Sequence, residues 1–327
     1  MRVSATAQAY FTGVPKPAKL LVSLFFIFLC LVAFFGTVKV SQATINGFVT
    51  GSYLGLGAMG LTLIMGVMKL VNLAYGDFLV AGAYFTLMFT ALGTPLPLSV
   101  LLAILGTALL SILAEKLVWR PLRNAGASTL QCFLSAIGLS FLIRFTIQFF
   151  GGSESRSFDI DVLSTMVLGP FRVGTQQALG FVMALAALSM LATGLWISGA
   201  MKTMRAVSDN RLLAEVCGIG VGHTIDLTSL LSGLLAGAAG IVYATAVGSF
   251  NPNFGLTLLL SLFAAATLGG IGNIYGAMLG GLVIGLSQEW SALLLGAKWK
   301  PLVALVFLVL MLLAVPRGIF ARAQRRP

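Results

Sequence analysis

The stretch GLGAMGLTLIMGVMKLVNLAYGDFLVAGAYF, Gly55 to Phe85, decides the fold. It is apolar on both sides of a short break at 69–72, and it contains six glycines and one acid, Asp77. In a soluble helix each interior glycine costs roughly 0.5–1 kcal/mol relative to alanine. In a bilayer the backbone must satisfy its own hydrogen bonds, so helix is nearly forced and glycine lets two helices approach closely. The stretch therefore predicts two consecutive membrane helices.

The composition of the whole chain agrees with this prediction. The chain is 58% hydrophobic and 9% charged, with a mean hydropathy of +1.02, whereas a soluble domain carries about 25% charged residues. The net charge of +11 does not imply nucleic-acid binding, because the positive residues lie at the ends of the apolar runs. The three cysteines and the single histidine form no metal-ligand spacing and no disulfide framework. The chain is predicted to be a polytopic membrane protein.

We predict an all-α fold of about nine or ten membrane-embedded helices, some of them short or broken. The apolar segments are 19–38, 44–68, 72–92, 98–118, 130–150, 176–197, 224–247, 256–268, 277–290 and 302–315. The first has a small-x-small sequence at 41–43, typical of a signal-peptide cleavage site, but its apolar core is long and we expect it to be retained. Segment 256–268 is too short for a core about 30 Å thick, so we expect it to enter the membrane without crossing.

The chain divides into an N-terminal segment with one added helix (1–43), a transmembrane domain (44–317) and a basic tail (318–327). The distribution of lysines and arginines predicts the orientation of the chain in the membrane. Fourteen of the 20 fall on one predicted side and five on the other, with Arg144 inside a segment. Because positive loops stay in the cytoplasm, both termini are predicted to be cytoplasmic. Lys298 and Lys300 fit this assignment poorly, so the last two passages are the least well defined.

Asp77 and Arg144 are charged residues that lie well inside apolar segments. An acid at mid-helix costs about 2.5–3.5 kcal/mol on insertion scales, so it is a candidate functional residue by default. The alternative for Asp77 is a structural role near a helix start capped by Asn72. For Arg144 we favour a paired or snorkelling side chain. Asp226 and Glu289 lie near segment ends and are expected to be interfacial.

The sequence LGGIGNIYGA, 268–277, interrupts the apolar run before the last two segments. Its glycines and Asn273 would leave backbone groups free at membrane depth, which is tolerated only where protein or a water-filled path satisfies them. The break is therefore either part of a transport path or an ordinary turn between two short helices.

The stretch MRAVSDNRLLAEVCGIG, 204–220, lies in a cationic loop at about 199–222. Asp209 or Asn210 can cap a short helix at 211–216, and Gly218 can close it. Leu212, Leu213 and Val216 would form its apolar face. Such a helix either lies on lipid headgroups or docks into a groove on a soluble partner, and we favour docking.

Three stretches together resemble the LivH-type permease subunits of ABC importers for branched-chain amino acids. They are NGFVTGSYLGLGAMGLTLIMGVMKLVNLAYGDFLVAGAY (46–84), RAVSDNRLLAEVCGI (205–219) and ATLGGIGNIYGAMLGGLVIGL (266–286). The likeness covers the chain in order from about Thr44 to Arg317, so residues before Thr44 form an added first helix.

This resemblance implies a subunit of the bacterial inner membrane that is not an enzyme and holds no cofactor or metal. Its partners would be membrane lipid, a second LivM-like permease, two cytoplasmic ATPases that hydrolyse ATP, and a periplasmic binding protein, with no role for nucleic acid. No G-x-x-x-x-G-K-[ST] loop occurs, which agrees with ATP hydrolysis by partner chains.

The resemblance also suggests site residues. The segment 205–219 matches the cytoplasmic loop that docks on the ATPase, with candidate docking residues Arg205, Asn210, Arg211, Leu213, Ala214 and Gly218. Leu212 stands where many other ABC importers have the Glu that opens this motif. The segment 72–77 matches a motif read as Asn-x-Ala-His-Gly-Glu, with Tyr75 in place of His and Asp77 in place of Glu. The candidate path residues are Asn72, Tyr75, Asp77, Gly272 and Asn273.

The substitutions at Tyr75 and Asp77 leave the substrate open, since related permeases handle urea, short amides or other amino acids. The rival class is an autonomous channel or an ion-coupled secondary transporter. That class needs no docking helix and places paired charges at the membrane midplane. An intramembrane enzyme is a third class, but the apolar segments contain no nucleophile–base or metal pattern.

Overall fold

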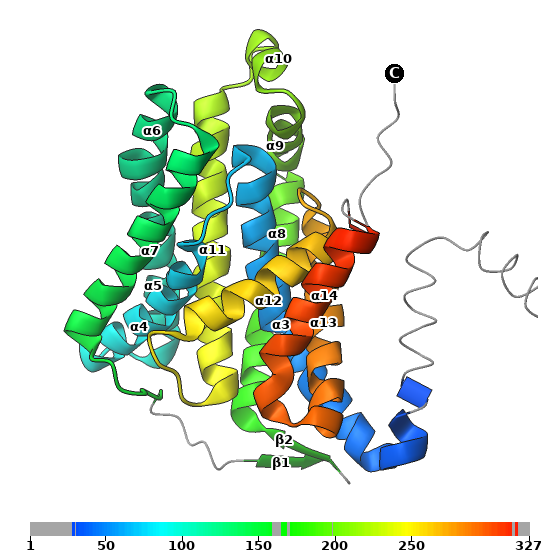
Figure 1. Cartoon of the computed structure of the whole chain (residues 1–327). Coiled ribbons are helices and arrows are strands. Elements are labelled where there is room, and N and C mark those ends of the chain that lie inside the picture. Colours follow the sequence, from blue (N-terminus) through cyan, green and yellow to red (C-terminus); the bar gives the residue numbers. More distant parts are fainter. Residues whose placement is uncertain are drawn as a thin grey trace, which may run out of the picture.

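The computed structural model describes residues 28–29, 31–158, 165–168, 171–197, 199–315 and 318–319. Within these residues the protein is a bundle of long helices (Figure 1). Five helical stretches are long and apolar enough to span a bilayer: 37–68, 96–124, 129–151, 221–247 and 274–295. The predicted fold class, a polytopic α-helical membrane protein, is confirmed.

The elements are arranged along the chain in a simple order. They are α3 (Thr37–Met68), α4 (Tyr75–Ala91), α5 (Leu96–Ala114), the π-helical turn η1 (Glu115–Trp119), α6 (Arg120–Asn124), α7 (Thr129–Gly151), β1 (Thr165–Leu168), β2 (Phe171–Gly174), α8 (Thr175–Ile197), α9 (Ala200–Asp209), α10 (Arg211–Val216), α11 (Val221–Val247), α12 (Phe254–Gly269), α13 (Ile274–Leu295), η2 (Ala297–Trp299) and α14 (Lys300–Ala314). The short antiparallel hairpin β1–β2, with Thr165 paired to Gly174, was not predicted. It flanks a Gly-Pro dipeptide, a turn signal that the apolar periodicity does not report.

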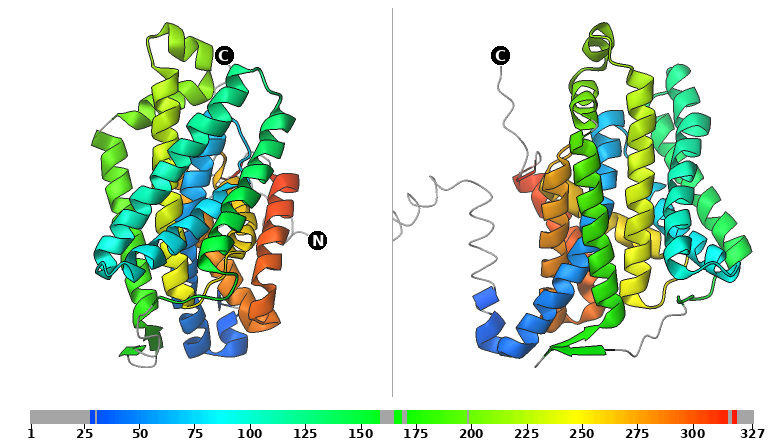
Figure 2. Two further views of the ribbon diagram at one scale, coloured as in Figure 1. Left: turned by 90° about the vertical axis from the view of Figure 1, so that its left-hand side faces the viewer. Right: turned by 180° about the vertical axis from the view of Figure 1, so that it is seen from behind.

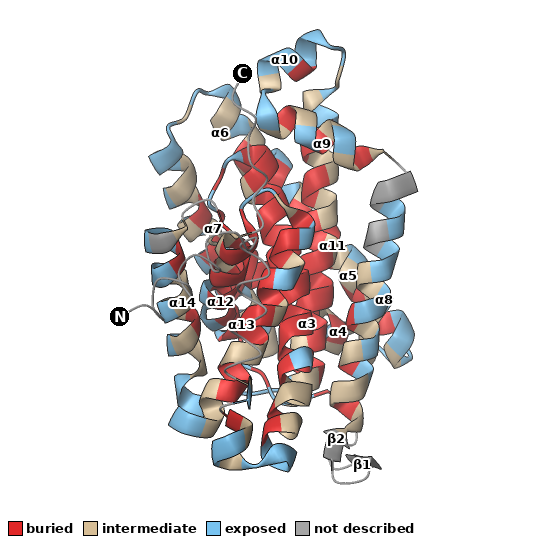
Figure 3. Ribbon diagram, turned by 90° about the vertical axis from the view of Figure 1, so that its right-hand side faces the viewer, coloured by how far each residue is buried: buried red, intermediate tan, exposed pale blue. Residues whose placement is uncertain are grey.

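Helix α3 forms the centre of the bundle, and α11, α12 and α13 surround it (Figure 3). Glycines lie where the helices cross and allow close approach, as predicted. On α13, a Cβ at Gly281 would lie 2.3 Å from the backbone nitrogen of Gly55 on α3, and a Cβ at Gly285 would lie 2.3 Å from that of Gly51. The backbones of α3 and α13 therefore touch directly. Exposed leucines instead cover the outer faces of α5, α7 and α14.

Two pairs of consecutive helices, α3–α4 and α11–α12, are interrupted in the same way. Six residues, 69–74, separate α3 from α4, and a linker of the same length, 248–253, separates α11 from α12. In each linker an asparagine forms a local turn: the Asn72 side chain accepts from the Ala74 amide at 3.0 Å, and the Asn251 side chain accepts from the Asn253 amide at 3.1 Å. The first turns of the two helices then meet, because a Cβ at Gly76 would lie 2.6 Å from the Gly255 carbonyl oxygen.

The contacts of the two halves correspond. Helix α3 packs on α13 as α11 packs on α5, α4 packs on α5 as α12 packs on α13, and α3 and α11 run in opposite directions (Figure 1). This is the arrangement of an inverted-topology repeat, a plan that places broken helices at the repeat interface. The predicted short piece 256–268 is the oblique helix α12, whereas α13 is longer than predicted and long enough to cross.

The predicted apolar segment 44–68 starts earlier in the structure than in the prediction. Helix α3 begins at Thr37, not at 44, and the candidate cleavage sequence at 41–43 lies inside it. The actual break is Gly36, whose positive φ of 83° suits glycine and ends the short helical stretch 31–35. The rest of the predicted first segment, like most of the basic tail, lies outside the described residues.

Candidate functional site

The end of the bundle where α9 and α10 lie carries the predicted docking loop (Figures 1 and 2). Helix α10 has the predicted bounds. The Asn210 side chain caps it by accepting from the Leu213 amide at 3.1 Å. Gly218 closes it at φ 81°, where the amide of Ile219 donates to the Ala214 carbonyl at 2.9 Å. Both the cap and the closing glycine are as predicted from the sequence.

The outer face of α10 is apolar and exposed. Leu212, Leu213 and Val216 are 77%, 61% and 85% exposed, whereas Ala214 is buried. Arg205 on α9 is exposed nearby, and its guanidinium contacts Met201 of its own helix. A short, doubly capped helix that presents three large apolar side chains is suited to fill a groove on a partner.

The inner side of the loop is bonded to the last turn of α3. The Ser208 hydroxyl donates to the Gly66 carbonyl at 2.8 Å, and the Arg211 guanidinium donates to the Val67 carbonyl at 3.1 Å. Burial and the neighbouring Arg123 lower the pKa of Arg211, which Glu115 partly opposes. Arg211, predicted as a docking residue, therefore also faces inward. Ser208 was not predicted, because its only signal is a place two residues before the cap.

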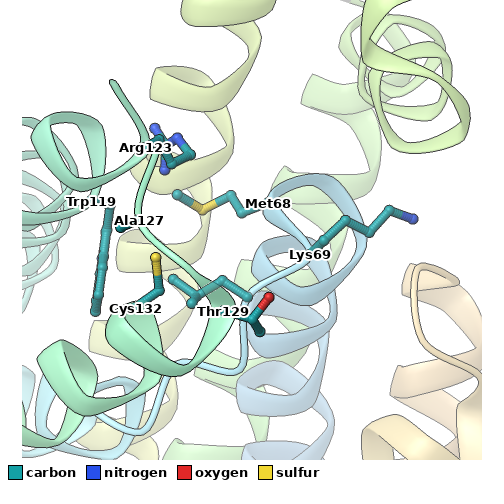
Figure 4. Close-up of a pocket in the computed structure, with 8 residues that line it drawn as sticks. Met68, Lys69, Trp119, Arg123, Ala127, Thr129 and Cys132 are labelled. Carbon is teal, nitrogen blue, oxygen red and sulfur yellow. The ribbon is translucent and has the colours of Figure 1, made fainter. Parts of the chain in front are cut away.

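Ion pairs surround this end of the bundle. Arg123 on α6 bonds the fully buried Glu115, which sequence reasoning missed. Arg120 pairs with Asp226 of α11 at 2.6 Å, so the predicted interfacial acid bridges two helices. Beside them lies a cavity of about 190 Å³, whose lining is shown in Figure 4; there Arg123 and Cys132 face the cavity while the Lys69 side chain extends away from it.

Asp77 is bound to Arg144, which joins α4 to α7. The Arg144 guanidinium donates to the two carboxylate oxygens at 2.9 and 3.1 Å, and the Ser140 hydroxyl donates to the same carboxylate. Both charged side chains are buried. Since α4 begins at Tyr75 rather than at 72, Asp77 lies in the first turn of its helix, where a negative charge is favoured. Arg144 is therefore paired, as favoured from the sequence.

The two remaining predicted residues before Asp77 lie deep in the bundle. Asn72 is buried and forms the turn described above. Tyr75 is fully buried, and its hydroxyl points at Gly60 of α3, where a Cβ would lie only 2.2 Å away. Within the described chain this hydroxyl has no hydrogen-bond partner.

Backbone groups at the break after α12 are hydrogen-bonded to other groups of the protein. The amide of Ile319 donates to the Leu268 carbonyl at 2.9 Å, and the Asn273 side chain caps α13 by accepting from the Gly276 amide at 3.2 Å. Gly272 packs against the end of α3, since a Cβ at Gly66 would lie 2.9 Å from the Gly272 Cα. The predicted path residues thus fall into two places: one at the start of α4, the other at the end of α3.

Helix α14 begins with Lys300 at the end of the bundle opposite α10 (Figure 1). The ammonium of Lys300 pairs with Glu289 at 2.6 Å, and Thr50 donates to the same carboxylate at 2.8 Å. Among the described residues, no group of three or more His, Cys, Asp or Glu side chains is arranged to hold a metal ion.

The bundle of apolar helices defines the class of the chain as a polytopic α-helical membrane protein. The family described as "Branched-chain amino acid transport system / permease component" matches residues 43–316, and the chain belongs to it. It is therefore a multi-pass permease of the inner membrane.

Named relatives agree with this family. The high-affinity branched-chain amino acid transport permease LivH of Salmonella typhimurium is 29% identical, over 86% of this chain and 96% of the relative. BraD of Pseudomonas aeruginosa, of the same description, is 30% identical over the same shares. The fructose import permease FruG of Bifidobacterium longum is 25% identical over 80% of both chains. The relatives therefore differ in the solute that their names give.

Proposed function

We propose that this chain is the permease subunit of an ABC importer that moves branched-chain amino acids or related small polar solutes. Two cytoplasmic ATPases would drive it, a second LivM-like permease would complete the path, and a periplasmic binding protein would deliver the solute. The segment α9–α10 carries this proposal, because its exposed leucines and the bonds of Ser208 and Arg211 to α3 suit a docking element.

The paired charge at Asp77 and Arg144 is what the rival class, an ion-coupled transporter, would require. Here, however, the carboxylate accepts from both the guanidinium and Ser140. A carboxylate so fully bonded holds α7 in place more readily than it binds a passing ion. We look for the path instead beside Tyr75, whose buried hydroxyl has no hydrogen-bond partner among the residues that the structure describes, and we retain Asn72, Gly272 and Asn273 as candidates for its border.

Uptake in reconstituted vesicles tests the function itself. We expect solute uptake only when the chain is reconstituted with its ATPases and second permease, with ATP on the cytoplasmic side and the binding protein opposite. A panel of leucine, urea, a short amide and fructose would identify the substrate class. Uptake by the chain alone, insensitive to ATP, would contradict the proposal.

Docking is tested by the double substitution Leu212→Asp/Leu213→Asp. Buried apolar anchors contribute about 2 kcal/mol or more at an interface, and each 1.4 kcal/mol is a factor of ten, so co-purification with the ATPases should fall by about tenfold or more. Leu212→Met/Leu213→Met is the matched control and should retain binding. Unchanged association of the Asp variant would point to a helix that lies on lipid.

The proposed orientation, with α10 and both termini in the cytoplasm, is tested by labelling. Cys217 is exposed next to α10, whereas Cys132 is only partly exposed. In a Cys30→Ser/Cys132→Ser background, a membrane-impermeant maleimide should label Cys217 in inside-out vesicles and not in spheroplasts. Labelling from the periplasmic side would reverse the topology.

A further inference from the structure

The last turn of α3 contacts two segments that are distant from it in the sequence. A helix leaves its last four carbonyls without partners inside the helix, and they need bonds from elsewhere. Ser208 and Arg211, from a loop more than 140 residues later in the chain, satisfy the carbonyls of Gly66 and Val67. The last turn of α3 has no basic residue of its own, so Arg211 also supplies the positive charge that a helix C-terminus favours.

The same turn also contacts the break between α12 and α13. Gly66 and Gly272 are in backbone contact. The break is in turn bonded to the chain at Ile319. The end of α3 therefore contacts both the loop that carries α10 and the turn that joins α12 to α13.

The linker between α3 and α4 directly follows this end of α3. Residues 69–74 are non-helical, and Lys69 adopts a left-handed conformation with φ 55°, which is rare for a side chain with a Cβ. This linker leads directly to the start of α4, where Gly76 meets Gly255 of α12. If the end of α3 moved, the linker would change its conformation. The start of α4, where the two broken helices meet, would then move as well.

We propose that Ser208, together with Arg211, is a positioning residue that transmits the movement of α10 to α3, so that ATP hydrolysis is coupled to solute movement. This inference rests on the proposed function. It assigns Ser208 no contact with the ATPase: the α9–α10 loop would dock through its exposed leucines and act through its bonds to Gly66 and Val67.

The test is Ser208→Ala in the complete reconstituted importer, with uptake and ATP hydrolysis measured on the same vesicles. A hydrogen bond contributes about 0.5–1.5 kcal/mol, so solute transported per ATP hydrolysed should fall by roughly 2- to 10-fold. Association with the ATPases should not change. Ser208→Thr keeps the hydroxyl and should restore the ratio, and Arg211→Gln should lower it as Ser208→Ala does.

Thr203→Val is the matched control, because the Thr203 hydroxyl lies on the same helix and donates to Ala200 within α9. It should leave the transport-to-hydrolysis ratio unchanged. An unchanged ratio in Ser208→Ala overturns the inference, as does loss of ATPase association, which would make Ser208 a docking residue. Failure of the proposed function is seen separately, in ATP-independent uptake by the wild-type protein.

Discussion

Replacing Arg144 by Gln should destabilise the folded protein by about 3–5 kcal/mol, because it leaves the Asp77 carboxylate buried without its cation. The loss should show as a lower thermal unfolding temperature of the detergent-solubilised protein and as reduced yield. Helix α7 should loosen first. Its other described side chains face mainly outward, and its packing within the chain is chiefly against α4.

The double variant Asp77→Asn/Arg144→Gln should be more stable than Arg144→Gln alone. Removing both charges replaces an unpaired buried ion with two amides that can bond each other, and a pair in contact is not additive. The matched control is Arg120→Gln. Arg120 pairs with Asp226 at 2.6 Å, but its side chain is 40% exposed, so its loss should cost only about 0–1 kcal/mol. If Arg120→Gln and Arg144→Gln lowered the stability equally, burial of the Asp77–Arg144 pair would not increase the cost of breaking it.

This pair shows what the sequence could and could not predict. Asp77 and Arg144 were each recognisable as charges within apolar segments, because charge in a membrane is costly wherever it lies. Their mutual pairing was not, since 67 residues separate them and no local pattern records which helices are neighbours. The position of Asp77 in its helix was also misjudged, because the break predicted at 69–72 extends to residue 74 in the structure.

Local signals were the more reliable ones. The cap at Asn210 and the closing Gly218 lie within a few residues of the helix that they bound, and both were predicted from the sequence. A local signal such as Asn251 is informative only when it is compared with a similar motif elsewhere in the chain. Asn72-Leu-Ala-Tyr75-Gly76 and Asn251-Pro-Asn-Phe254-Gly255 share the pattern Asn-x-x-aromatic-Gly, and the two glycines meet in space. The inverted repeat was thus present in the sequence, but only as a five-residue likeness.

Gly240→Ala should prevent α4 and α11 from packing at their present distance, at a cost above about 3 kcal/mol, beyond the usual range for an inserted methyl group. A Cβ at Gly240 would lie 1.9 Å from the Leu79 carbonyl oxygen, so the two helices must separate. Side-chain rotation cannot relieve the contact, because the atoms of Leu79 involved are backbone atoms. We expect loss of monodisperse protein on purification and a lower unfolding temperature in what remains.

The same substitution at Gly138 separates this effect from helix propensity. Gly138 lies in the interior of α7, and a Cβ there would meet nothing within 4 Å. Alanine is the better helix former by about 1 kcal/mol, so Gly138→Ala should be neutral or stabilising. If Gly240→Ala behaved like Gly138→Ala, α4 and α11 would not be in backbone contact. Gly82, whose Cβ would lie 2.7 Å from the Gly237 Cα at the same crossing, offers an independent check. Because α4 carries Tyr75 and Asp77, any variant that moves it away from α11 should also reduce uptake in the reconstituted importer, in proportion to the folded protein lost or beyond it.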